Sequence, residues 1–334
     1  MSTRPVGIPG GASSLSAMRL CAIDVGSNTV RLLVADVIGG GTWRIAGQDQ
    51  TITRLGENLA RSGALGEEPM ARTLAAVSGY VERGARLGAS AIRIVATSAV
   101  REASNGRAFA AAVERATGRR VDVVSGKVEA RLTLLGVRHG LSLLSGVMLT
   151  FDIGGGSTEY VLSEGDAIRS IVSLRLGVVP LAERFPFPGI VERSRYRELY
   201  DEVRRRLDRE LPDAIRSARV AHLIGTAGTV TALAALDLGL VRYDPDRVHG
   251  HVLSGAAVGR LLERLCALTV AERAALPCLE PGRADLIVPG TAIVQASMDQ
   301  IGVDALAVSE YGLREGVIVD AIEDHHGSRP GAAP

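Results

Sequence analysis

IDVGSNTVRLLVAD, at residues 23–36, and FDIGGGSTEYVLSE, at residues 151–164, are two versions of one pattern. Each has an apolar strand that ends in Asp-x-Gly, a short run of small residues, and a second apolar strand. Asp24 and Asp152 hold the same position in the two copies and are 128 residues apart (152 minus 24), about one domain length. The repeat predicts a duplicated fold in which two β-hairpins face each other.

The residue types in this pattern suit phosphate together with a divalent cation. A carboxylate at the end of a buried strand can hold a hydrated cation. The glycines that follow let backbone N–H groups approach phosphate oxygens with no side chain in the way. Two such hairpins on either side of a cleft would therefore hold a phosphate chain between them.

Composition describes an ordinary globular protein. The 334 residues predict about two domains, and a formal net charge of +1 provides no global field that would attract a polyanion. Any phosphate affinity must therefore be built locally. Lys127 is the single lysine, so arginine supplies 37 (38 minus 1) of the basic residues. A composition bias of the genome is enough to explain this preference for arginine over lysine, although the planar guanidinium group of arginine also suits phosphate.

The three cysteines, Cys21, Cys266 and Cys278, have no C-x-x-C spacing. Neither a zinc site nor a disulfide framework is indicated, and we expect a cytoplasmic location. Residues 1–17 are rich in Gly, Pro and Ser and lack the apolar stretch of a signal peptide. We expect a disordered leader there, with Met18 as an alternative start.

Residues 221–241 form the most membrane-like segment. The Gly and Thr residues of its first half and Asp237 in its second favour a buried strand, a phosphate-binding turn and a helix over a membrane span. The strand is expected to stop at Gly225 and the helix to start near Thr229, with its N–H groups facing the cleft.

Strands and helices succeed one another in both halves of the chain. In the first half we expect antiparallel strands between residues 20 and about 51, a helix at 69–87, a strand at 91–98, a helix at 109–117, a strand at 120–125 and a helix at 126–140. The second half repeats the hairpin at 147–162 and adds a third strand at 167–177. Strands that precede helices on the same sheet predict an α/β fold with mixed rather than fully parallel sheets.

Residues 191–211 predict a long amphipathic helix dense in arginine. It could be a basic track for a long anionic chain. A solvated face with ion pairs between residues i and i+4 is the favoured interpretation.

Eight phrases in a fixed order extend the pattern over nearly the whole chain. They are DVGSNTVRL (24–32), ATSAVREA (96–103), SGKVEARL (125–132), DIGGGSTE (152–159), GTAGT (225–229), VHGHVLS (248–254), GRADLIVPG (282–290) and SEYGLREG (309–316). Together they resemble the exopolyphosphatase and guanosine pentaphosphate phosphohydrolase (Ppx/GppA) family, within the actin, hsp70 and sugar-kinase superfamily. The resemblance implies two duplicated ribonuclease H-like (actin-like) domains around a central phosphate-binding cleft. Residues 18–146 would form domain I, with the helix 310–324 packed back on it, residues 147–309 would form domain II, and residues 325–334 a flexible tail.

The resemblance also implies roles for individual residues. Glu129 would be the catalytic base that activates water, and Mg²⁺ or Mn²⁺ would be held by Asp24, Asp152 and Glu159. The expected phosphate-binding residues are Gly26, Ser27, Asn28 and Arg31 in the first hairpin, Arg101, then Gly154, Gly155, Gly156, Ser157 and Thr158 in the second hairpin, and Gly225, Thr226, Gly228 and Thr229.

Structural roles compete with these assignments. Glu129 could be a helix-start glutamate, but with Ser125 as N-cap it falls one position past the capping-box partner. Asp152 could cap its turn, and Arg101 could make a surface ion pair. Duplication of the aspartate and the surrounding motifs favour the functional roles.

Two further motifs have plain structural interpretations. His249 and His251 invite a metal site, but alternate residues on a strand supply no third ligand, so core or supporting roles are favoured. Thr226 and Thr229 could simply bond their own turn.

The leading functional hypothesis is a metal-dependent exopolyphosphatase that releases orthophosphate from inorganic polyphosphate. Removal of the 5′ phosphate from guanosine pentaphosphate is the alternative within the same fold, and an ATP-dependent sugar-kinase-like phosphotransferase or a noncatalytic actin-like binder are the others. Longer relatives add a helical region that holds long polyphosphate. Since this chain ends at Pro334, we expect short substrates and distributive release. The resemblance to two-domain members, which are commonly dimeric, implies a homodimer, and we expect neither nucleic acid nor membrane as partner.

Overall fold

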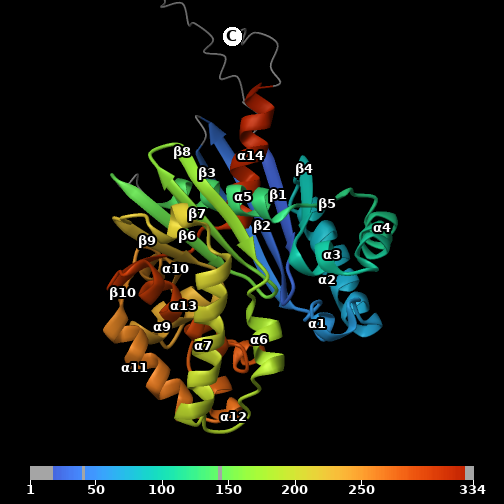
Figure 1. Ribbon diagram of the computed structural model, residues 1–334. Helices are drawn as coiled ribbons and strands as arrows, with labels where there is room; N and C mark the ends of the chain where they lie inside the picture. The colour runs from blue at the N-terminus through green and yellow to red at the C-terminus, as the bar shows by residue number, and fades with distance from the viewer. Residues whose placement is uncertain (1–17, 40–41, 142–144, 328–334) are drawn as a thin grey trace, which may run out of the picture.

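The structure, a computed structural model, describes residues 18–39, 42–141 and 145–327. The expected leader at 1–17 and most of the expected tail lie outside the described residues. Two β-sheets follow one another along the chain, with two helices between them and the remaining helices on their outer sides (Figure 1).

The first sheet has five strands in the order β3-β2-β1-β4-β5. Its strands are β1 (Arg19–Val25), β2 (Thr29–Gly39), β3 (Thr42–Ile52), β4 (Ala91–Ala96) and β5 (Val121–Val123). The first three pair antiparallel, whereas β4 and β5 continue the sheet in parallel with β1. β1 is buried along almost its whole length because helices cover both faces of the sheet.

The second sheet repeats this order as β8-β7-β6-β9-β11 and adds β10 at its edge. Its strands are β6 (Val147–Ile153), β7 (Thr158–Glu164), β8 (Ala167–Leu174), β9 (His222–Thr226), β10 (Val252–Ser254) and β11 (Ala305–Ser309). Again three antiparallel strands are followed by two parallel ones. The predicted duplication and the mixed sheets are both confirmed.

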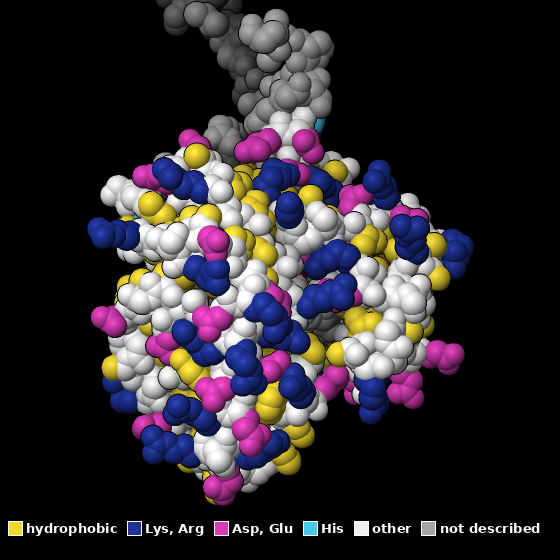
Figure 2. All heavy atoms as spheres, in the orientation of Figure 1, with side chains coloured by type: hydrophobic (Ala, Val, Ile, Leu, Met, Phe, Trp, Pro, Cys, Tyr) yellow, Lys and Arg dark blue, Asp and Glu magenta, His cyan; other side chains and the backbone are white. Residues whose placement is uncertain are grey.

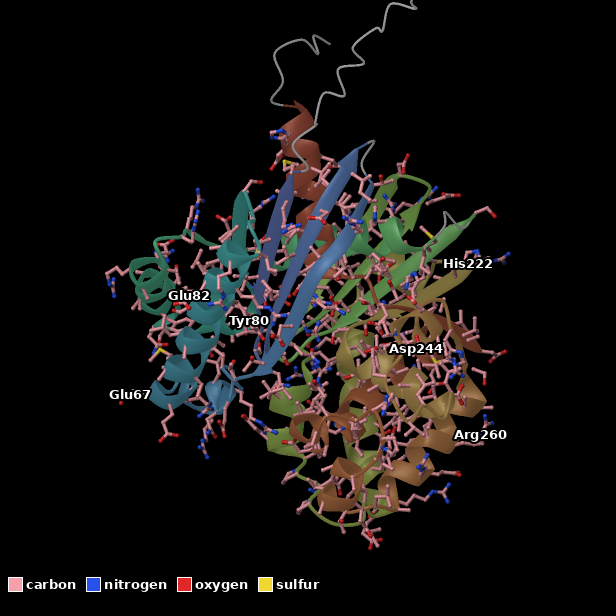
Figure 3. All side chains as sticks on the ribbon, turned by 180° about the vertical axis from the view of Figure 1, so that it is seen from behind. Glu67, Tyr80, Glu82, His222, Asp244 and Arg260 are labelled. Carbon is pink, nitrogen blue, oxygen red and sulfur yellow. The ribbon has the colours of Figure 1, made fainter. Side chains whose placement is uncertain are left out.

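Helices on the outer side of each sheet form its main core. Those of the first half are α1 (Leu59–Ser62), α2 (Glu67–Arg86), α3 (Ser98–Glu102) and α4 (Gly106–Thr117). Those of the second half are α6 (Val178–Arg184), α7 (Arg193–Glu210), α8 (Asp213–Arg216), α9 (Gly228–Asp237), α10 (Pro245–Val248), α11 (Gly255–Cys266), α12 (Val270–Ala274), the 3-10 turn η1 (Pro281–Arg283) and α13 (Ile287–Ile301). Tyr80 of α2 turns toward the first sheet, where its hydroxyl lies 2.8 Å from Thr51 Oγ1 (Figure 3).

Helices α5 (Gly126–Gly140) and α14 (Leu313–Gly327) form a layer between the sheets. Apolar residues of α14 pack on β1 and β2, while Ala130 and Leu134 of α5 pack on the second sheet through Val161. The two helices cross at glycines. A Cβ on Gly136 would lie 2.0 Å from Gly312 O, and one on Gly316 would lie 1.8 Å from Leu132 O. Only glycine permits this approach of two backbones.

Several details of the sequence predictions need correction. α14 continues to Gly327, past residue 324 where the sequence analysis ended the helix, so residues 325–327 are not tail. His249 and His251 do not lie on a strand. Asp244 caps α10 just before them, and Gly250 between them has φ 77°, so they belong to a turn. His249 Nε2 lies 2.9 Å from Gly140 O and His251 Nε2 lies 2.9 Å from Asp237 Oδ2, which are supporting contacts.

Two predictions about exposed and apolar segments are confirmed. Residues 221–241 fold into β9 and α9, and none of the described helices combines the length and apolarity that a bilayer crossing needs. On α7, arginines pair with acids one turn away, as in Arg197–Asp201 (3.7 Å) and Arg204–Asp208 (3.9 Å). Basic and acidic side chains are accordingly interspersed over this face (Figure 2).

Candidate active site

A cavity of about 570 Å³ lies where the two halves meet, within the range of small-ligand sites. Its walls include both Asp-x-Gly turns, the start of α5, the N-terminus of α9, and the segment that joins β11 to α14. Figure 2 shows the surface hollowed between the region of α1–α4 and the rest of the molecule.

The two Asp-x-Gly turns have the same hydrogen bond. Gly26 N donates to Thr29 O (3.1 Å), and Gly154 N donates to Ser157 O (2.9 Å). Each turn thus joins its strands at equivalent positions, which confirms that the sequence repeat is a structural repeat.

The turns touch each other across the cleft. A Cβ on Gly155 would lie 2.9 Å from Ser27 Cβ, and a Cβ on Gly156 would lie 2.5 Å from Ser98 Oγ. The glycines of the second turn therefore allow the first turn and the start of α3 to approach closely. The two hairpins that the sequence placed face to face do meet at one point.

The two copies of the hairpin differ in the residue that pairs with the aspartate on the neighbouring strand. Asp24 pairs with Arg31 across β1 and β2, whereas Asp152 pairs with Glu159 across β6 and β7. Directly opposed residues project from the same face of a sheet. One half therefore places a cation beside its aspartate, and the other half places a second carboxylate there.

Four carboxylates gather around this point: Asp24, Glu129 and Glu159 are buried, and Asp152 is partly buried. Burial raises the pKa of Asp24 to about 6, against the opposing effect of Arg31, and burial and the charge of Asp152 raise the pKa of Glu159 to about 7. Burial raises the pKa of Glu129 well above its ordinary value, and repulsion from Glu159 adds to that effect. Burial likewise raises the pKa of Asp152. The cluster has more negative charge than its neighbours compensate.

Arg101 of α3 binds the predicted base. Its Nη1 donates to Glu129 Oε2 (2.9 Å) and to Val124 O (2.9 Å). Ser125 caps α5, with its Oγ accepting from Val128 N, so Glu129 lies in the first helical turn, as predicted. The guanidinium opposes the rise in the pKa of Glu129, because a nearby positive charge favours the ionised form.

Three buried polar atoms of the first turn lack a hydrogen-bond partner among the described residues. They are Asp24 Oδ1, Ser27 Oγ and Asn28 Oδ1. Buried polar groups are nearly always bonded, so these three neighbouring atoms are available to a bound ligand or to water. Two of them are acceptors beside the excess of carboxylates, which fits a cation.

The acid side chains do not by themselves form a complete metal cage. Within the described residues, no group of three or more His, Cys, Asp or Glu side chains has ligand geometry. Mg²⁺ commonly binds through one or two carboxylates and keeps several waters, so Asp24 and Asp152 on facing turns fit it. Glu159 is less available, because its Oε1 accepts from Ser173 Oγ (2.6 Å).

Arg283 also lines the cavity, and the sequence predicted no role for it. Burial and the nearby charge of Arg31 lower the pKa of Arg283 to about 10. Its Nε lies 2.7 Å from Glu280 Oε2 in an ion pair that lacks hydrogen-bond geometry. The guanidinium covers Gly228 so closely that a Cβ there would lie 1.5 Å from Nη1. Two arginines and the N-terminus of α9 thus favour an anion at this place.

Most residues predicted for the site line this one cavity. They are Asp24, Gly26, Ser27, Asn28, Arg31, Glu129, Asp152, Gly154, Gly155, Gly156, Ser157, Thr226, Gly228 and Thr229.

Five predicted residues have other surroundings or other bonds. Thr158 Oγ1 donates to Leu176 O, and Gly225 packs against the Phe151 ring, so neither faces the cavity. Thr226 lines the cavity, but its hydroxyl donates to Ser309 O and Tyr311 O. Arg101 and Glu159 do not line the cavity, and they bond to Glu129 and Ser173, respectively. A hydroxyl or glycine in a motif cannot show from sequence which way it will face once the strands pair.

Comparisons with known proteins agree with this geometry. The model of the Ppx/GppA phosphatase family matches residues 33–325. Exopolyphosphatase 2 of Mycobacterium tuberculosis is 34% identical over 319 residues, covering 91% of this chain and 98% of that protein. The crystal structure of the Aquifex aeolicus Ppx/GppA family member has a TM-score of 0.78 and 31% identity, covering 92% of this chain and 98% of the other. An exopolyphosphatase structure from Cytophaga hutchinsonii has a TM-score of 0.85 and 26% identity, with the same coverage.

Proposed function

Because this chain belongs to the Ppx/GppA phosphatase family, we propose that it is an exopolyphosphatase that hydrolyses the terminal phosphoanhydride of inorganic polyphosphate. The observation that carries the proposal is Glu129, a buried carboxylate at the wall of the cavity where both Asp-x-Gly turns meet. The names of its relatives point to the same substrate.

The reaction needs no covalent intermediate with the protein. Phosphoanhydride hydrolysis has a loose transition state, so catalysis depends on a positioned water and on compensation of phosphate charge. Glu129 would take the proton from the attacking water, and because burial raises its pKa, its carboxylate is a stronger base than an exposed glutamate. Arg101 holds the Glu129 carboxylate in place.

The other residues of the cleft would bind and orient the chain. Backbone N–H groups of the two glycine-rich turns approach phosphate oxygens, and Arg31 and Arg283 add positive charge farther along. Mg²⁺ or Mn²⁺, held by Asp24 and Asp152, would supply charge compensation for the phosphate oxygens. Glu159 would support these carboxylates from behind.

Guanosine pentaphosphate is a second candidate substrate because part of the cavity is apolar. Leu279, Leu286 and Ile287 line it beside Tyr243. Polyphosphate has no group that uses such a surface, whereas a nucleoside does. Parallel assays with short polyphosphate, long polyphosphate and guanosine pentaphosphate would rank the substrates by kcat/KM.

We also propose a cytoplasmic homodimer, from the resemblance to two-domain members of the family. Light scattering behind size-exclusion chromatography would measure the mass in solution. A mass near 35 kDa, that of one chain, would contradict the dimer.

The base is tested by Glu129→Gln, which keeps the shape of the side chain and removes the charge. We expect kcat to fall by about 10²- to 10⁴-fold, the range for loss of a general base, with polyphosphate binding retained. Glu68→Gln on α2, at a side chain that is 93% exposed, is the matched control and should change nothing. Normal turnover by the Glu129 variant would end the proposal.

A further inference from the structure

The segment that follows β3 crosses to the other half of the molecule and binds it. Arg54 Nη1 donates to Asp285 Oδ2 and its Nη2 donates to Asp285 Oδ1, both at 2.9 Å, and Nη2 also donates to Gly282 O (3.1 Å). This is a bidentate pair, the stronger form of an arginine–carboxylate interaction. Since Arg54 belongs to the first half and Asp285 precedes α13 of the second, the pair joins the two halves.

Further bonds run between the same segments. Arg283 Nη2 donates to Gln50 Oε1 (3.2 Å), and Gln50 Nε2 donates to Glu280 Oε1. We call residues 50–58 and 280–285 together the clamp. Asn58 N, at one end of it, donates to Glu183 Oε1 of α6 (2.6 Å). Several simultaneous bonds make the clamp more than an isolated surface ion pair, which would contribute little.

The clamp is tied to the first phosphate turn. Arg54 N donates to Asn28 O (3.0 Å) and Gly56 N donates to Ser27 O (2.7 Å). Arg54 itself has φ 51°, in the left-handed region that a non-glycine residue rarely adopts. Such a conformation persists only where surrounding bonds impose it, and it concentrates at functional sites. The backbone of Arg54 and Gly56 therefore connects the clamp directly to the first Asp-x-Gly turn.

The clamp borders the cavity at a different part from the base, although Arg54 and Asp285 themselves do not line it. Gln50, Glu280 and Arg283 line the cavity. Arg283 interacts with Arg31 and Glu280, whereas Glu129 interacts with Arg101, Glu159 and Asp152. A chain with its terminal phosphate at Glu129 would pass Arg31 and Arg283 and then reach the bond between Gln50 and Glu280.

We propose that the Arg54–Asp285 pair limits the chain length of the substrate by holding the two halves together at the part of the cleft that lies away from Glu129. A short polyphosphate ends inside the closed cleft. A longer one must pass the clamp and break the pair, so it binds more weakly. The inference rests on the proposed exopolyphosphatase function and adds to it the element that selects length.

The test compares kcat/KM for short and long polyphosphates of defined length in the wild-type protein and in Arg54→Gly. Glycine removes the guanidinium and suits the left-handed backbone, so this variant should fold. We expect the ratio of long-chain to short-chain kcat/KM to rise roughly fivefold, the factor that corresponds to about 1 kcal/mol for a well-formed exposed pair. Asp285→Asn should give the same rise.

Two variants control for effects other than the pair. Arg195→Ala removes an arginine that pairs with Glu198 within α7, and it should leave the ratio unchanged. The double variant Arg54→Asp with Asp285→Arg should restore the wild-type ratio, because aspartate tolerates the left-handed region and the charges are exchanged.

The outcomes separate this inference from the function itself. An unchanged ratio in both Arg54→Gly and Asp285→Asn, with the wild type active, would overturn the clamp and leave the exopolyphosphatase standing. Phosphate release from no polyphosphate of any length by the wild type would overturn the proposed function.

Discussion

At the scale of single residues, the site is defined by several carboxylates that lie close together and away from water, where the charged form of each is disfavoured. The duplicated hairpin places Arg31 opposite Asp24 but Glu159 opposite Asp152, so the second half adds negative charge where the first half adds positive charge. Desolvation and mutual repulsion then raise the pKa of each acid. A site for a polyanion is usually positive, and this excess of carboxylates is the reason why a divalent cation is part of the proposed function.

Asp24 provides a prediction about stability and pH. Its pKa is about 6 in the folded protein and near 3.8 in the unfolded chain, so between these values the native state holds a proton that the unfolded state has lost. Its contribution to stability is therefore present below about pH 4 and is lost as the pH rises through 6. Asp24→Asn avoids this loss, about 3 kcal/mol as an upper order of magnitude.

The measurement is the melting temperature of both proteins from pH 4 to pH 8 without metal. The advantage of the Asn variant should grow from pH 4 to pH 6 and then stay constant, reaching several degrees. Added Mg²⁺ at pH 8 should raise the melting temperature of the wild type more than that of the variant. The exposed Asp166→Asn in the β7–β8 turn is the control, and a variant less stable than the wild type at pH 8 would contradict the account.

At the scale of elements, the crossing of α5 and α14 holds the site together. α5 carries Glu129, and the first turn of α14 carries Arg314 and Glu315, which line the cavity together with Glu310 just before the helix. The helices approach so closely that the backbone of one contacts the backbone of the other at Gly136 and Gly316. Helix propensity alone would disfavour glycine at these positions, so packing decides them.

Substitution by alanine separates packing from propensity. Gly136→Ala should lower the free energy of unfolding by about 1–3 kcal/mol, because its Cβ has no room beside Gly312 O. Gly79→Ala in α2, where nothing lies within 4 Å of the added Cβ, should instead raise it by up to about 1 kcal/mol. Denaturant titration of both variants measures the difference. If Gly136→Ala has the same free energy of unfolding as Gly79→Ala, then α5 and α14 can move apart without loss of stability, which would contradict the account.

At the scale of the whole molecule, two similar halves meet around one cavity and are joined at more than one place. The clamp is one such place. At another, Arg175 of the second half pairs with Glu102 of α3 (3.2 Å), and Ser98 Oγ donates to the same carboxylate (2.9 Å). If the clamp limits chain length as proposed, a long substrate must dissociate after each cleavage before its new end can bind.

Product ladders on gels test this consequence. With long polyphosphate in excess, we expect intermediates of every length, because the chain dissociates between cleavages. Complete digestion of some molecules while the rest remain intact would show processive hydrolysis and would contradict distributive release.

Much of the architecture was determined by the sequence alone. Two Asp-x-Gly hairpins one domain apart predicted the duplicated mixed sheets, and period and turn residues predicted α2, α4, α5, α7, α9 and α14 within a few positions. These are local properties, set by backbone sterics and by the alternation of apolar residues along each strand or helix. The shorter helices α1, α3, α6, α8, α10 and α12, and also α11 and α13, were not predicted. The two aspartates were found from their repeated motif, whereas the role of Glu129 came from the resemblance to the family.

Tertiary structure decided what no local pattern contains. Arg283, the Arg54–Asp285 pair and the partner of Glu129 depend on segments more than twenty residues apart being brought together, and the direction of Thr158 depends on which strands pair. The pKa of each acid likewise depends on burial and on charges from the other half of the chain. The residue types of the site follow from local sequence because they are set by the chemistry of phosphate, whereas their charge states and contacts follow from packing, which the whole chain determines at once.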